Sequence, residues 1–77
     1  MTHELKIDEQ YFDAVIEGIK NFEIRLNDRN FEVGDGILLQ EVDSLRKYTG
    51  RTVSGTITYI TDYQQKEGFV VFGFNKN

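Results

Sequence analysis

The sequence contains no cysteine, no proline, no tryptophan and only one histidine. Without cysteine the chain cannot form a disulfide, a cysteine-ligated zinc site or a thiol nucleophile. The single histidine, His3, cannot build a histidine-based metal site alone, and we interpret it as an ordinary residue of the N-terminal segment. We therefore expect no metal site and no cofactor, which leaves charged, polar and aromatic side chains to carry any function.

Long apolar stretches are also missing. No run approaches the roughly 20 residues that a membrane helix needs, and the charged start, Met1–Asp8, lacks the apolar core of a signal peptide. We therefore expect a cytoplasmic protein with no membrane association, and we also expect it to be a monomer. The 77 residues suffice for a single domain, 1–77, to whose modest core six Phe and four Tyr contribute.

Charge is unevenly distributed along the chain. Thirteen acidic and nine basic residues give a net charge of −4, which disfavours non-specific binding to nucleic acid. The basic residues nevertheless gather in two groups, Arg25 with Arg29, and Arg46 with Lys47 and Arg51. A local basic patch can therefore still operate on this acidic chain.

One amphipathic helix is predicted near the N-terminus. Asp8 and Glu9 suit a helix start, because carboxylates favour the positive end of the helix dipole. Apolar residues then follow at helical spacing, and Gly18 is placed to end the helix in a left-handed cap. The apolar stripe of this helix is Phe12, Val15, Ile16 and Ile19.

Five strands complete the predicted fold. Alternating or β-branched segments predict strands over residues 3–7, 21–26, 37–42, 53–61 and 69–74. In the second of these, Phe22, Ile24 and Leu26 alternate with polar residues, which predicts a strand with one buried face. The class is α+β, mainly β, in the order β-α-β-β-β-β. A small five-stranded β-barrel with the helix capping one opening is the most economical arrangement.

The segment Gly18–Arg25 holds the densest group of candidate functional side chains. Glu23 and Arg25 lie two residues apart on one side of a strand, about 6.5–7 Å between Cα atoms, and Lys20 lies in the preceding connection. Arginine offers a planar fork for a carboxylate, a phosphate or a base edge, and glutamate accepts from an amine or acts as a base. The same three residues can instead form an ion-pair network that braces the helix–strand junction.

The pattern G-x-K-x-x-E-x-R in this segment resembles the signature of the ASCH domain, the activating-signal-cointegrator homology branch of the PUA-like superfamily. Further segments match the same succession along nearly the whole chain, and the chain looks most similar to a small bacterial and phage subfamily of unassigned function. These segments are Phe31–Asp35, Leu39–Glu41, Tyr48–Arg51, Thr56–Ile60 and Val70–Phe74.

The resemblance implies a PUA-like barrel with a cleft beside the helix that binds RNA or a nucleotide-like ligand. The charged motif residues would form the cleft floor, and the second basic group could extend it, since Arg and Lys contact phosphates and an aromatic ring stacks on a base. That second group can equally be an ordinary solvated loop. The candidate ligand-binding residues are Gly18, Lys20, Glu23, Arg25, Lys47, Tyr48 and Arg51.

Two alternative functions remain open. Some small relatives hydrolyse an acyl group from a modified cytidine with the motif lysine and a threonine three residues later. Here Lys20 matches that lysine, but Glu23 occupies the threonine position. A metal-independent hydrolase of a modified nucleoside or RNA would therefore use Lys20 and water activated by Glu23, with Glu41 as the only guess for a third catalytic carboxylate.

The other alternative is a protein-interaction adaptor. Glu9, Asp13 and Glu17 lie at successive i, i+4 positions on the polar side of the predicted helix. They can dock a basic partner or form a solvated face that keeps the domain soluble. We favour binding of RNA or a nucleotide over hydrolysis, because the hydroxyl that the hydrolases need is missing. We favour it over the adaptor, because a run of like charges more often forms a solvated face.

Overall fold

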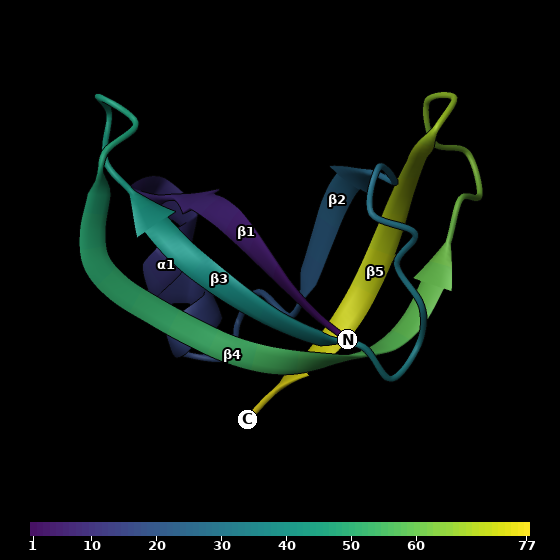
Figure 1. The fold of residues 1–77 in the computed structure, drawn as a ribbon, viewed down its shortest axis with the longest axis horizontal. Coiled ribbons are helices and arrows are strands. Elements are labelled where there is room, and N and C mark those ends of the chain that lie inside the picture. Colours follow the sequence, from purple (N-terminus) through teal and green to yellow (C-terminus); the bar gives the residue numbers. More distant parts are fainter.

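The computed structural model describes residues 1–77 and contains five strands and one helix (Figure 1). The mainly β class and the predicted order β-α-β-β-β-β are confirmed. Most strands lie within two residues of their expected bounds, but β4 begins at Tyr48 rather than at Val53. The elements are β1 (Thr2–Asp8), α1 (Glu9–Ile16), β2 (Phe22–Leu26), β3 (Gly36–Val42), β4 (Tyr48–Thr61) and β5 (Phe69–Lys76).

The five strands form one curled sheet in the order β1-β3-β4-β5-β2. Strand β1 pairs parallel with β3, and the other neighbours are antiparallel. The sheet curls until its two edge strands, β1 and β2, face each other across an open side (Figure 1). The expectation of a closed barrel is therefore wrong, and the fold is a half-barrel.

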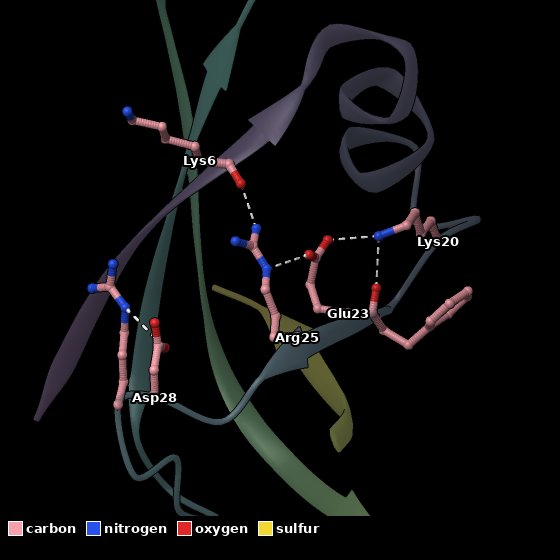
Figure 2. Close-up of polar contacts among 7 residues, drawn as sticks. Lys6, Lys20, Glu23, Arg25 and Asp28 are labelled. Carbon is pink, nitrogen blue, oxygen red and sulfur yellow. Dashed lines mark hydrogen bonds and ion pairs between the residues drawn. The ribbon is translucent and has the colours of Figure 1, made fainter. Parts of the chain in front are cut away.

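A side chain, rather than a backbone ladder, spans the gap between β1 and β2. The Arg25 guanidinium donates to the carbonyl oxygen of Lys6. Glu23 and Arg25 both project into this gap from β2 (Figure 2). Inward-pointing charges are a common device that prevents direct pairing of strand edges, which explains why the barrel stays open here.

The long strand β4 provides much of the curvature. A Cβ atom at Gly55 would lie only 2.7 Å from the carbonyl oxygen of Asn75, so no larger residue fits. The pairing register between β4 and β5 also shifts between Ile57 and Tyr59. A glycine at a close approach and a bulge both allow a strand to bend.

Helix α1 packs on the inner side of the half-barrel. Phe12 and Val15 are almost completely buried, whereas Ile16, the last residue of the helix, and Ile19, beyond its end, are exposed. No helix in the structure has the length and apolar character required to cross a bilayer. The helix contributes to one core cluster that contains Leu5, Ile7, Phe12, Val15, Phe31, Ile37, Leu39, Ile57, Val70, Phe72 and Phe74.

Strand β2 buries its charged side and exposes its apolar side. Glu23 is 6% exposed, whereas Ile24 is 55% exposed and its neighbours Phe22 and Leu26 are similarly open. This arrangement reverses what the alternation suggests. The period of two shows which side chains share a face, but the position of β2 at the end of a curled sheet decides which face points inward.

Candidate functional site

The connection between α1 and β2 sets the position of Lys20. Gly18 has φ +78°, which confirms the predicted left-handed cap, and a Cβ there would meet no atom within 4 Å. Glycine is therefore favoured by backbone conformation alone. The backbone N–H groups of Ile19 and Lys20 both donate to the carbonyl of Ala14, at 2.9 and 3.0 Å. This turn directs Lys20 back toward β2.

Lys20, Glu23 and Arg25 form one hydrogen-bonded cluster (Figure 2). Lys20 Nζ donates to Glu23 Oε1 at 2.6 Å, and Arg25 Nε donates to Glu23 Oε2 at 3.0 Å. Lys20 Nζ also donates to the carbonyl of Phe22 at 2.8 Å. An ionised carboxylate has about four acceptor positions, so each oxygen of Glu23 keeps one position that no protein donor fills.

The cluster lies in a cleft with a volume of about 500 Å³. Clefts of about 300–1,000 Å³ are typical of small-molecule sites. The three charged residues therefore converge in a concave site and do not splay over a convex surface. The cleft is lined by the basic residues Lys6, Lys20, Arg25 and Arg46, the acidic residues Asp8 and Glu23, the aromatic residues Tyr11 and Phe22, and Ile7 and Ile24.

Two aromatic rings flank the cluster. Lys20 Nζ lies 5.6 Å from the ring centroid of Tyr11 and 5.1 Å from that of Phe22. Cation–π attraction at these distances helps to hold the ammonium group between the rings. Both rings are partly exposed, so each offers π-surface to a ligand that enters the cleft.

The turn between β3 and β4 places Arg46 beside the cleft. Asp43 Oδ1 accepts from the backbone N–H groups of Leu45 and Lys47, at 2.9 and 3.0 Å. Arg46 itself has φ +64°, which is uncommon for a residue other than glycine. Its guanidinium pairs with the carboxylate of Asp8 at the end of β1. Strained residues of this kind often occur at functional sites.

Arg51 belongs to a different cluster. Its Nε donates to Glu41 Oε1 at 2.9 Å, and its Nη2 donates to Glu41 Oε2 at 2.8 Å and to Asp13 at 3.1 Å. Its guanidinium carbon lies 4.7 Å from the ring centroid of Phe12. These contacts tie the β3–β4 hairpin to α1, and neither Arg51 nor Glu41 lines the cleft.

The same contacts shift the titration of the pair. Hydrogen bonds from Arg51, and then from Thr49 Oγ1 at 2.5 Å, lower the pKa of Glu41 to about 2. The hydrogen bond to Glu41 raises the pKa of Arg51 above its ordinary value. This salt bridge therefore stays charged over the whole physiological range.

The structure separates the residues that the sequence suggested for the site. Lys20, Glu23 and Arg25 meet in the cleft, and Tyr48 lines a neighbouring hollow. Gly18 shapes the turn before Lys20, whereas Lys47 lines neither depression. No group of His, Asp and Glu side chains is arranged to hold a metal ion.

Seven of the ten cleft residues were not among the sequence candidates, and four of these seven bring a basic or an aromatic side chain. These four are Lys6, Tyr11, Phe22 and Arg46. Phe22 was assigned to the apolar side of its strand, and Arg46 was noted as part of the second basic group, which was proposed as an extension of the cleft. The position of Phe22 within the motif and the basic group around Arg46 were the local signals, because Lys6 and Tyr11 arrive from β1 and α1.

The fold and the cleft together define a small, mainly β protein with a charged concave site on the open side of a half-barrel. Over residues 2–74 the chain matches a family described as a domain of unknown function (DUF3850), and it belongs to this family. It is also 48% identical, over 61 residues, to the "Uncharacterized 12.9 kDa protein in GpA 3'region" of Escherichia phage P2. That match covers 78% of this chain and 54% of the phage protein, so the chain spans about half the length of this relative.

Proposed function

We propose that the chain is a cytoplasmic, ASCH-like module of the PUA-like type whose cleft binds RNA or a nucleotide. The observation that carries this proposal is the inversion of β2, which places Glu23 inside and Ile24 outside. Burying a charge costs several kcal/mol in desolvation, about as much as a good ion pair returns. Leaving a large apolar side chain in water forgoes about 1.5–3 kcal/mol. A ligand site accounts for this arrangement, whereas apolar packing would brace the strand better.

The free acceptor positions of Glu23 suit a nucleobase. Guanine, adenine and cytosine each present an exocyclic amine, and a carboxylate accepts from such groups. Tyr11 and Phe22 provide rings on which the base can stack. We therefore expect a base with an amine to bind better than uracil.

The basic side chains of the cleft suit the phosphate. Four cations face two carboxylates there, on a chain of net charge −4. Lys6 and Arg46 line the cleft and are exposed. Neither of them pairs with Glu23, so both can contact a phosphate while the Glu23 ion pairs stay intact. Because phosphate contacts release counterions, the affinity should fall as salt concentration rises.

The contacts of Glu23 favour binding over hydrolysis. Both carboxylate oxygens already accept from a cation, so an attacking water would compete with the ligand for the remaining positions. No hydroxyl or thiol is present at the motif to replace the missing threonine. On the acidic side of α1, Asp13 is engaged by Arg51, which reduces the acidic surface that an adaptor would use.

A titration of the ¹⁵N-labelled protein with AMP, CMP, GMP and UMP tests the proposal. Resonances of Lys20, Glu23 and Arg25 should move on titration, while those of the loop 62–68 should not. Arg46→Ala should weaken binding about fivefold or more, because a charged hydrogen bond contributes about 1.5–3 kcal/mol when it is well formed. Lys66→Ala removes the same charge from the distant loop and serves as the matched control.

Two results would contradict the proposal. In the first, no resonance of the cleft moves with any of the four nucleotides at millimolar concentration. In the second, Lys66→Ala weakens binding as much as Arg46→Ala does, which would mean that only the overall charge of the chain attracts nucleotides.

A further inference from the structure

A second depression adjoins the cleft on the outer side of β1. It has a volume of about 470 Å³, and we call it the outer hollow. Lys6, Arg25 and Arg46 line both the cleft and the outer hollow. The outer hollow adds Arg29, Tyr48, Glu4 and Gln40. Lys6 alternates along β1 with buried residues, so its side chain points away from the core. The two depressions are therefore continuous around the edge of β1.

The outer hollow repeats the chemistry of the cleft. Tyr48 is 58% exposed, and Lys6 Nζ lies 5.7 Å from the centroid of its ring. Lys6 forms no ion pair with any carboxylate. An exposed ring beside an unpaired ammonium group suits a stacked base with a phosphate close by. The cleft also has exposed rings beside an ammonium group, but that group, Lys20 Nζ, is paired with Glu23.

Charge is concentrated in the combined groove. Five of the nine basic residues of the chain line the cleft or the outer hollow, against three carboxylates. Two of these carboxylates, Glu23 and Asp8, are already paired with cations of the same groove. The groove is thus positive on an otherwise acidic chain, as expected for a site that follows a phosphodiester backbone.

We propose that the cleft and the outer hollow bind two consecutive nucleotides of a single-stranded oligonucleotide. This inference rests on the proposed function and extends it. The first base lies in the cleft beside Tyr11 and Phe22, and the second base stacks on Tyr48. The linking phosphate lies at Lys6 and Arg46, which belong to both depressions.

Tyr48 distinguishes this proposal from a site for one nucleotide with several phosphates. A phosphate gains little from an aromatic ring, whereas a base that stacks on one gains about 5- to 150-fold in affinity. The second base is also tethered to the first, so it binds at a high effective concentration. A dinucleotide should therefore bind more tightly than a diphosphate of similar charge.

Calorimetric titration with three matched probes tests this inference. The probes are a nucleoside 5′-monophosphate, the corresponding 5′-diphosphate and the 5′-phosphorylated dinucleotide, each with A, C, G and U. We expect the dinucleotide to bind at least about fivefold more tightly than the diphosphate at the same salt concentration. Tyr48→Ala should bring this ratio to about one, whereas Tyr63→Ala, which removes an exposed ring elsewhere, should not change it.

The outcomes separate this inference from the proposed function. Suppose that the monophosphate binds, but the dinucleotide binds no more tightly than the diphosphate or Tyr48→Ala leaves their affinity ratio unchanged. The two-nucleotide groove is then wrong, and the nucleotide-binding cleft stands. If none of the probes binds, the proposed function is wrong as well. If the dinucleotides bind as expected, their deoxyribose versions show which kind of strand the groove prefers. A preference for ribose indicates RNA, and equal affinity indicates that any single strand binds.

Discussion

Replacing the Lys20–Glu23–Arg25 cluster with apolar residues of similar size shows whether its charges serve folding or a ligand. The triple variant K20M/E23L/R25M removes all three charges together. In the structure these side chains are 18%, 7% and 24% exposed, in chain order, so each has lost most of its hydration. The cluster is therefore close to the buried case, in which desolvation offsets the attraction between the charges.

The expected change can be worked out from these contacts. Replacing a buried ion cluster with apolar residues is often neutral or stabilising by about 1–4 kcal/mol. The variant also loses the hydrogen bond from Arg25 to the carbonyl of Lys6, which contributes about 1 kcal/mol. We expect the free energy of unfolding to stay unchanged or to rise by up to about 3 kcal/mol. Arg25→Met alone should lower it by about 2–4 kcal/mol, because Glu23 then keeps only one partner.

Urea unfolding at pH 7, followed by far-ultraviolet circular dichroism, measures these differences. The triple variant should unfold with the same dependence on urea as the parent protein, and it should no longer bind any nucleotide that the parent binds. A triple variant that is less stable than Arg25→Met would refute the reasoning. The cluster would then be a structural brace, and the inversion of β2 would no longer favour a ligand site.

Three further predictions concern acid stability, backbone strain and the exposed side of β2. Because the pKa of Glu41 falls from an ordinary 4.5 to about 2 on folding, its stabilising contribution is complete above pH 4.5 and is lost as the pH falls toward 2. Glu41→Gln should flatten the urea midpoint against pH in this window, and an unchanged slope would contradict the assignment. Arg46→Gly should leave stability unchanged or raise it by up to about 1 kcal/mol, since φ is +64°, yet weaken nucleotide binding in the same titration; a marked loss of stability would show that the turn is not strained. Ile24→Thr should change the free energy of unfolding by less than about 0.5 kcal/mol, whereas Ile57→Thr in the core should lower it by more than about 2 kcal/mol. Equal effects of these two changes would mean that β2 is covered in solution.

Local sequence patterns predicted the elements well. Phe12 and Val15 lie on the buried side of the helix because helical spacing needs only neighbouring residues. Gly18 marks the end of the helix because its left-handed backbone conformation is a property of one residue. Lys20, Glu23 and Arg25 could be proposed together because all three fall within six positions of the chain.

The tertiary structure decided the features that depend on distant partners. The alternation around Glu23 defines two faces of a strand, but only the curl of the sheet turns the charged face inward. The barrel stays open because two edges far apart in the chain, β1 and β2, meet through charged side chains. Arg51 joins Glu41 instead of the cleft, since a buried carboxylate on the adjacent strand holds it.

The cleft shows the same division between local and distant information. Its charged floor comes from one short segment and was visible in the amino-acid pattern. Its rim comes from Lys6, Tyr11 and Arg46, which meet that floor only after α1 and the β3–β4 turn have packed. Periodicity and turn preferences act over a few residues, whereas the shape and charge of a cleft result from contacts between segments whose relative positions no local pattern specifies.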